Sequence, residues 1–262
     1  MFLWESLSEL PWVEIDNSVG ENHCEQVIPC NVYQTWENNL FGKTHAASIL
    51  EFRGLNPHLN FFLYTAKERD LYMRKHYEST RIYEIYQKAN FGQIKADIFR
   101  YCIIYERGGY YFDISKGMTL PLNTLHKPSS DFFLSNENTS SLVPPDPKIF
   151  SRVSHPTKLF AQYGFGFSAH HPILARVLSN IEAYSWLFEG KTFQDPARQI
   201  RIFTGPGMFI RSIHEEILSS NMNLIETAGL DFNGASIFSQ PGSHMRYRQF
   251  APYDLVTNSI LF

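Results

Sequence analysis

Residues 108–115, GGYYFDIS, decide the fold: two glycines and three aromatic residues lead into a single aspartate, Asp113. Removing a lone carboxylate from water is costly, so either another group neutralises Asp113 or the strand ends there at the surface. The preceding residues 93–107 carry apolar side chains at helical spacing and predict the clearest helix of the chain. The two glycines are expected to end that helix, because glycine readily adopts the left-handed conformation. A strand at 110–114 then follows directly.

Outward from this stretch, strands and helices alternate. Strands are predicted at 28–36, 60–65, 110–114, 131–135, 164–169, 223–226 and 234–238. Helices are predicted at 44–54 with Thr44 as N-cap, at 66–77, 80–91 and 93–107, from near Pro172, and from Thr204-Gly205-Pro206 to about 218. The proline-rich residues 136–158 are expected to form a long loop. This order predicts an α/β fold with a mostly parallel central sheet and helices on both faces. In such sheets ligands bind beyond the carboxyl ends of the strands, where Asp113 lies.

Composition narrows the function classes. The chain has 262 residues, 44% of them hydrophobic and 19% charged, which is typical of a folded globular domain. The formal net charge of −3 argues against a nucleic-acid partner. Cys24, Cys30 and Cys102 are odd in number and dispersed, so we expect no disulfide framework and a reducing compartment. We expect neither a signal peptide nor a transmembrane segment, because no basic leader or long apolar run occurs.

Strand alternation gives Asp113 its first chemical interpretation. Asp113, Ser115 and Tyr111 are expected on one side of the strand, where a carboxylate and a hydroxyl can face a cation, a water or a sugar hydroxyl. Lys116 is expected to point away as a solvated surface lysine.

A second polar pair lies on the preceding helix. Asp97 and Arg100 are spaced i, i+3 and are therefore neighbours. The spacing alone favours an ion pair on the helix surface, which is worth less than about 1 kcal/mol.

Residues 96–101, ADIFRY, together with Tyr105 and 108–115, carry a family resemblance. They resemble the pattern ADxxRYxxLYxxGGxYxDxD of the DXD-containing sugar-nucleotide glycosyltransferases of glycosyltransferase family 32. That family includes yeast initiating mannosyltransferases, capsular polysaccharide enzymes and the glucosyltransferase domains of large clostridial toxins. The resemblance is close over residues 28–122 and loose over 160–215, where Thr204-Gly205-Pro206 is similar to the TGP element of the family.

The resemblance implies a GT-A fold with a Rossmann-like nucleotide-binding half. It implies a lead-in at 1–27 and one domain at 28–262, with a donor half at 28–122 and an acceptor half with its C-terminal tail at 123–262. The implied reaction is a retaining transfer of a sugar from a UDP- or GDP-sugar to a glycan, in surface polysaccharide biosynthesis. The implied location is the cytoplasm, at the inner face of the membrane, with peripheral association through a lipid-linked acceptor. The alternative is a catalytically silent protein of this fold that binds sugar nucleotides or glycans.

Residue by residue, the resemblance assigns five donor-site positions. Gln34 and Trp36 would hold the nucleoside base, with Trp36 stacking on it. Asp97 would accept hydrogen bonds from sugar hydroxyls, and Arg100 would reach the sugar or the diphosphate. Asp113 matches the first Asp of the DXD motif and would contact ribose, sugar and metal. Asp113, Asp97 and Arg100 are the expected catalytic residues.

One position departs from the pattern. Ser115 stands where the family has the second aspartate, and a hydroxyl is a far weaker cation ligand. Three outcomes are open: Mn²⁺ or Mg²⁺ still binds through Asp113 and Ser115 with a C-terminal ligand, cationic side chains neutralise the diphosphate instead, or catalysis is lost. His244 is the candidate C-terminal ligand, ahead of Asn233. Glu137, just after a predicted strand, is a candidate contact for the acceptor.

Overall fold

A computed structural model describes residues 12–18, 25–220, 228–250 and 259–261. Its centre is a five-stranded sheet in the order β4-β2-β5-β10-β7. The strands are β2 (Asn31–Thr35), β4 (Asn60–Tyr64), β5 (Gly109–Phe112), β7 (Phe132–Phe133) and β10 (Gly164–Phe167). β2 pairs parallel with β4 and β5, whereas β10 runs antiparallel to both of its neighbours. Four strands therefore run in one direction, as expected for a mostly parallel sheet.

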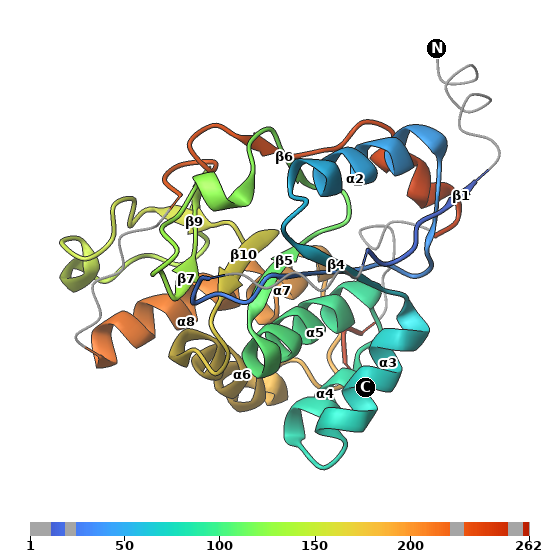
Figure 1. The fold of residues 1–262 in the computed structure, drawn as a ribbon. Coiled ribbons are helices and arrows are strands. Elements are labelled where there is room, and N and C mark those ends of the chain that lie inside the picture. Colours follow the sequence, from blue (N-terminus) through green and yellow to red (C-terminus); the bar gives the residue numbers. More distant parts are fainter. Residues whose placement is uncertain (1–11, 19–24, 221–227, 251–258, 262) are drawn as a thin grey trace.

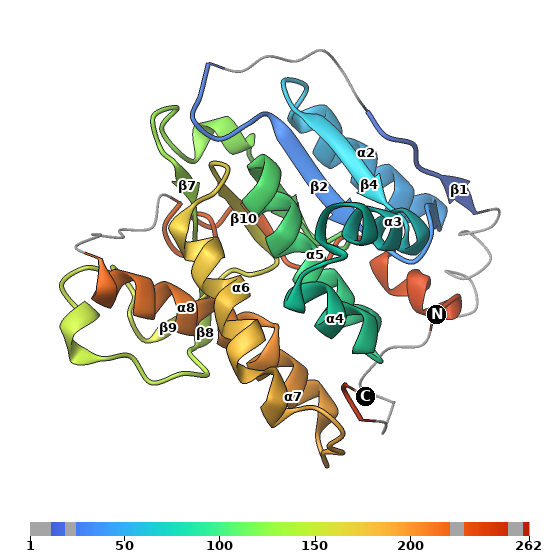
Figure 2. The same ribbon diagram turned by 90° about the horizontal axis from the view of Figure 1, so that it is seen from below.

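Helices cover both faces of this sheet. They are α2 (Lys43–Leu55), α3 (Ala66–Tyr77), α4 (Arg81–Lys88), α5 (Gly92–Arg107), α6 (Pro172–Tyr184), α7 (Pro196–Phe203) and α8 (Pro206–Ser219). Figure 1 shows α2 above the strands and α5 below them. Viewed from below in Figure 2, α6 lies beside α5 and also packs against α8. The α/β prediction with helices on both faces is confirmed.

Side-chain alternation along β5 explains why both faces are covered. Phe112 points to the α2 side, where its ring lies 5.2 Å from that of Phe52. Tyr111 points to the opposite side, where its ring stacks 6.0 Å from Phe165 in the core that also contains residues of α5. All four residues of β5 are buried. A strand buried on both faces has a continuous run of apolar residues, and the apolar stretch GGYYF therefore suits β5 to the centre of the sheet.

The two glycines join α5 to β5 without a loop. Gly108 has φ +64° and is the C-cap of α5, so the predicted end of the helix is confirmed. Gly109 has φ +109°, and a β-carbon there would lie 2.5 Å from the carbonyl oxygen of Asn31 on β2. Glycine is required here by both the backbone conformation and the close approach of β2.

Smaller elements surround the main sheet. Three two-stranded sheets pair β1 (Val13–Glu14) with β3 (Leu40–Phe41), β8 (Asn136–Ser140) with β9 (Lys158–Phe160), and β6 (Gly117–Met118) with β11 (Ser236–Ile237). Short 3₁₀ helices are η1 (Leu122–Thr124), η2 (Pro147–Ile149), η3 (Ser185–Leu187) and η4 (Ser243–Arg248).

Several local predictions differ from the structure. Residues 136–158 are not one loop, because β8 and β9 form a hairpin whose prolines lie between the strands. Gly42, not Thr44, is the N-cap of α2. The helix α7 was missed, although Asp195 caps it before a proline at its first turn. The expected strand at 223–226 lies outside the described residues.

The cysteines also differ from the expectation. Cys30 is disulfide-bonded, whereas we expected no disulfide framework. Cys102 is a free thiol buried in α5. Because structural disulfides persist in oxidising environments, the Cys30 bond counts against the predicted reducing compartment.

Candidate functional site

A cavity of about 680 Å³ opens where the carboxyl ends of β2 and β5 meet the first turns of α5 and α8. Its walls also include residues of the C-terminal segment 246–250. This volume falls in the usual range for a small-molecule site. Of the residues predicted from sequence, Trp36, Asp97, Arg100, Asp113 and Ser115 all line it.

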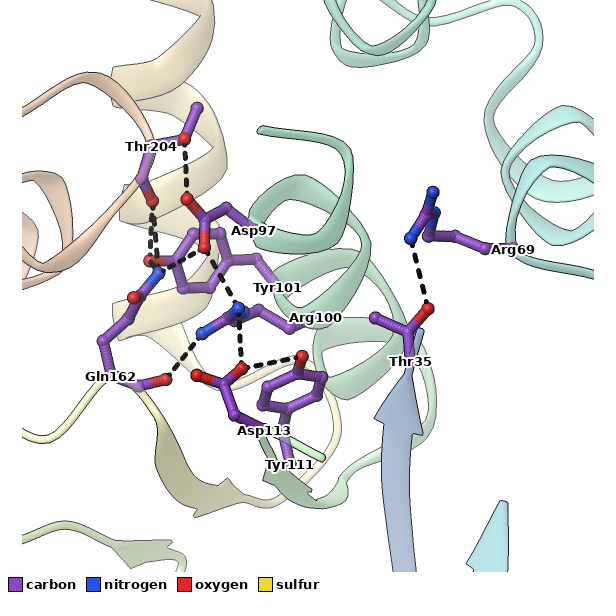
Figure 3. Close-up of polar contacts among 9 residues, drawn as sticks. All are labelled: Thr35, Arg69, Asp97, Arg100, Tyr101, Tyr111, Asp113, Gln162 and Thr204. Carbon is purple, nitrogen blue, oxygen red and sulfur yellow. Dashed lines mark hydrogen bonds and ion pairs between the residues drawn. The ribbon is translucent and has the colours of Figure 1, made fainter. Parts of the chain in front are cut away.

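Arg100 occupies the centre of a buried polar network (Figure 3). Its Nη2 lies 3.1 Å from Asp97 Oδ1 and 3.0 Å from Asp113 Oδ1. Its Nη1 donates to the carbonyl oxygen of Gln162 at 2.9 Å, and its guanidinium carbon lies 4.4 Å from the centre of the Tyr111 ring. Although burial opposes the charge, the nearby Asp113, Tyr111 and Asp97 together outweigh it, and the pKa of Arg100 is raised. Arg100 is therefore a fixed cation.

Asp97 is held from three sides. Its Oδ1 accepts from Gln162 Nε2 at 2.9 Å as well as from Arg100, and its Oδ2 accepts from Thr204 Oγ1 at 2.8 Å. Only 5% of Asp97 and 5% of Arg100 is exposed, so the interpretation of the pair as a surface ion pair is wrong. Burial raises the pKa of Asp97, and the Arg100 charge and both hydrogen bonds act against that rise.

Asp113 is the accessible end of this network. Its side chain is 31% exposed, and its Oδ1 receives both Arg100 and the Tyr111 hydroxyl, the latter at 3.1 Å. The contacts of Asp113 with Arg100 and Tyr111 both involve Oδ1, and among the residues drawn in Figure 3 Oδ2 has none. The question raised by the sequence is thus answered twice: Arg100 neutralises Asp113, and β5 ends one residue before it.

Lys116 lies on the same cavity as Asp113, so the prediction of a surface lysine pointing away is wrong. The Lys116 amide donates to the Asp113 carbonyl oxygen at 2.9 Å, which shows that the chain turns and strand alternation stops. Lys116 Nζ lies 3.3 Å from the centre of the Phe238 ring and 2.6 Å from the Phe238 carbonyl oxygen. Burial lowers the pKa of Lys116, and Asp113 partly offsets this.

Gln34 and Trp36 differ in access. Gln34 is 1% exposed and is not among the residues that line the cavity. Trp36 does line it, with the rings of Tyr247 and Phe250 edge-on at 6.3 and 6.2 Å. The guanidinium of Arg246 lies 5.2 Å from the Trp36 ring centre. Of the two residues predicted to hold a base, the geometry favours Trp36.

Part of the chain matches a known protein family. Residues 29–131 match the family described as "Glycosyltransferase sugar-binding region containing DXD motif". Residues 29–131 form a DXD-type glycosyltransferase region. The matched segment runs from the start of β2 past Asp113, so the resemblance to DXD-type glycosyltransferases is confirmed. Family 32 itself stays a prediction.

Two further proteins resemble the chain that contains this region. The "Initiation-specific alpha-1,6-mannosyltransferase" of Candida albicans is 25% identical over 207 residues, which cover 72% of this chain and 53% of that protein. The chain thus spans about half the length of this relative. The solved structure "PaToxG Glycosyltransferase" is 13% identical, with a TM-score of 0.51 over 83% of this chain and 76% of that one. The structural likeness confirms the GT-A fold.

The predicted metal site depends on which donor groups lie on the cavity wall beside Asp113. Ser115 lines the cavity, but His244 is exposed and does not. Over the described ranges, no three His, Cys, Asp or Glu side chains are grouped so as to hold a metal ion. The carboxylate of the motif, Asp113, already shares its Oδ1 with Arg100. On their own, Asp113 and Ser115 offer a Mn²⁺ or Mg²⁺ ion one carboxylate and one hydroxyl, which is a poorer ligand set than two carboxylates.

Two residues of the network were not predicted as site residues. Gln162 precedes β10 and bridges Asp97 to the Tyr101 hydroxyl, which it reaches at 2.8 Å. Thr204 precedes α8 and belongs to the TGP element, which was the available signal. No sequence motif marks Gln162, because only the path of the chain into β10 brings it to Asp97.

Glu137 was predicted to contact the acceptor. Burial raises the pKa of Glu137 to about 7 against the attraction of Lys116. Glu137 does not line the cavity, so its contact with an acceptor stays a prediction.

None of the helices in the described residues has the length and apolar character that crossing a bilayer requires.

Proposed function

We propose that the protein is a glycosyltransferase that moves a sugar from a nucleoside diphosphate donor to a glycan acceptor. The observation that carries the proposal is the junction of Arg100 with Asp97 and Asp113 on the wall of the cavity. The cavity as a whole favours an anion, because five cationic side chains line it against three carboxylates: Arg69, Arg100, Lys116, Arg201 and Arg246 against Glu37, Asp97 and Asp113.

The network assigns a part to each residue. Asp113 Oδ2 is free to accept a hydrogen bond from a hydroxyl of the donor sugar or ribose. Arg100 is held too tightly to follow a ligand, so it holds Asp113 in place. Asp97, whose oxygens are both engaged, positions Arg100. Trp36 offers its ring to the base. In this assignment Asp113 touches the donor, and Asp97 acts through Arg100.

The transfer follows from the charges. The bond between the anomeric carbon and the diphosphate oxygen breaks, and negative charge grows on the leaving diphosphate. Cationic side chains on the wall stabilise that charge. In the retaining reaction we propose, the acceptor hydroxyl attacks the same face of the sugar and its proton passes to the leaving phosphate. No protein general base is then required.

The donor and the setting are finer parts of the proposal. Mannose is the first sugar to test, because the Candida albicans relative is a mannosyltransferase. A glycan acceptor, a role in surface polysaccharide synthesis and a lipid-linked acceptor at the membrane stay predictions. A cytoplasmic location also stays a prediction, and the Cys30 disulfide counts against it.

The rival is a binding protein without catalysis, which Ser115 motivates. The test uses the full chain with GDP-mannose, UDP-glucose and UDP-galactose, in a thermal-shift screen followed by an assay of nucleotide release. A donor at 100 times its dissociation constant should stabilise the protein by about 2.7 kcal/mol. Release of UDP or GDP that Asp113→Asn abolishes supports the enzyme. A stabilising donor without turnover, with acceptor glycans present, supports the rival.

A further inference from the structure

Three cations on the cavity wall lack a carboxylate partner. Arg69 has Glu37 at 3.6 Å, and Arg100 has two aspartates. For Lys116, Arg201 and Arg246, the described part of the chain offers no ion pair, although all three line the cavity. Arg201 is exposed and therefore screened by water, whereas Lys116 and Arg246 are partly buried. Partly buried cations on a cavity wall indicate an anionic ligand.

Lys116 and Arg246 also act on one another. Lys116 comes from the turn after β5 and Arg246 from η4, far apart in the sequence. After burial, the positive charge of Arg246 is a further cause that lowers the pKa of Lys116, against the opposing effect of Asp113. The two cations thus repel each other, and both line the cavity. An anion between them would remove this repulsion.

Two buried N–H groups near Arg246 point to the same ligand. Arg246 Nε and Trp36 Nε1 are both buried, and neither has a hydrogen-bond partner among the described residues. An unsatisfied buried donor costs about 1–3 kcal/mol. The ligand that fills the cavity would supply acceptors, and a planar guanidinium is well suited to phosphate oxygens.

The donor set for a metal is correspondingly poor. Ser115 replaces the carboxylate that a DXD motif would offer, and His244 lies off the cavity. Removing one anionic ligand weakens a divalent cation site, whereas Lys116 and Arg246 carry positive charges on the cavity wall that can balance phosphate charge. Both facts favour charge neutralisation by side chains.

We propose that Lys116 and Arg246 bind the diphosphate of the donor directly, so that nucleotide binding needs no divalent cation. This inference rests on the proposed function and concerns how the same site is charged. Arg246 now contacts the Trp36 ring and donates to the Ser243 carbonyl oxygen and the Tyr247 hydroxyl. It would exchange these contacts for the phosphates, which would leave the Trp36 ring open to the base.

The test is calorimetric titration of UDP and GDP into the full chain, once with EDTA and once with Mn²⁺. We expect the better nucleotide to bind with affinities that agree within about threefold in the two conditions. Arg246→Gln and Lys116→Met should each weaken binding at least about tenfold in EDTA, because each removes a charged contact to phosphate. Arg248→Gln is the matched control, since Arg248 is an exposed residue of the same segment that does not line the cavity.

The outcomes separate the two proposals. Binding that occurs with Mn²⁺ but disappears in EDTA overturns this inference and leaves the proposed function intact. Absence of binding by either nucleotide in both conditions overturns the proposed function. Ser115→Asp gives an independent check: it should add a Mn²⁺-dependent gain in affinity that the natural chain lacks. If the natural chain already shows the full Mn²⁺ gain, the inference is wrong.

Discussion

Replacing Thr204 by valine should destabilise the protein by about 2 kcal/mol, although valine has nearly the same shape. Thr204 is fully buried, and its Oγ1 donates to Asp97 Oδ2 at 2.8 Å. The Asp97 carboxylate is also buried, so no water can replace the lost donor. A hydrogen bond to a charged group contributes about 1.5–3 kcal/mol, and the valine variant loses this one while keeping the apolar contacts.

The pH dependence of this loss follows from Asp97. Burial already raises the pKa of Asp97, and the Thr204 hydrogen bond acts against the rise. Valine removes that opposition, so the pKa of Asp97 in the folded protein rises further. The ionised carboxylate is then penalised in the folded state but not in the unfolded chain. The destabilisation should therefore be largest near neutral pH and shrink as the pH falls and Asp97 becomes protonated.

The assay is thermal denaturation near pH 7 and near pH 5, with Thr204→Ser as the matched control. Serine keeps the hydroxyl and loses one buried methyl group, which costs about 1 kcal/mol. The valine variant should be the less stable of the two, with a midpoint temperature lowered by about 6 °C if each kcal/mol shifts it by about 3 °C. Equal stability of the two variants, or a loss independent of pH, would refute the assigned role of the Thr204 hydroxyl.

Three further predictions concern the site, acid stability and the α5–β5 junction. Asp113→Asn should abolish transfer and leave the midpoint temperature within a few degrees, because the side chain is 31% exposed and asparagine retains one acceptor; nucleotide release and thermal unfolding check this. His214 is 4% exposed with its pKa lowered by burial to about 4, so stability should fall as the pH drops from about 6.5 to 4, by up to about 3 kcal/mol. His214→Leu should flatten that fall in denaturation curves taken across this range. Gly109→Ala should cost about 3 kcal/mol or more because of its φ of +109° and the 2.5 Å contact. Gly54→Ala, on α2 with nothing within 4 Å, should be neutral or stabilising by up to about 1 kcal/mol in the same measurement.

Local patterns predicted the elements that place the site. The helical spacing in 93–107 and the glycines after it predicted α5 and its direct passage into β5. Both signals are local, because a helix repeats every few residues and a left-handed C-cap needs only glycine. The turn after β5 has no such local signal. Extending strand alternation beyond Phe112, where β5 ends, placed Lys116 on the wrong side.

The burial of Asp97 was beyond a local pattern. The i, i+3 spacing with Arg100 is the same for a surface pair and for a buried one. What decides burial is contact with Gln162, 65 residues away, and with Thr204, 107 residues away. Such partners become neighbours only when β10 and α8 have packed against α5. The family resemblance located the pair at the site, but it did not supply these partners.

Ser115 separates what the sequence pattern can predict from what only the folded structure decides. The sequence pattern reveals that a carboxylate is missing, because the neighbouring motif positions are all present. It leaves open whether a cation, a cationic side chain or nothing takes over the charge. That choice depends on Arg246, which the fold brings from η4 to the Trp36 ring at 5.2 Å, and on Lys116, which a turn redirects into the cavity. Loss of one negative charge and the arrival of two positive ones act in the same direction, since both make the cavity a better host for a diphosphate without a metal.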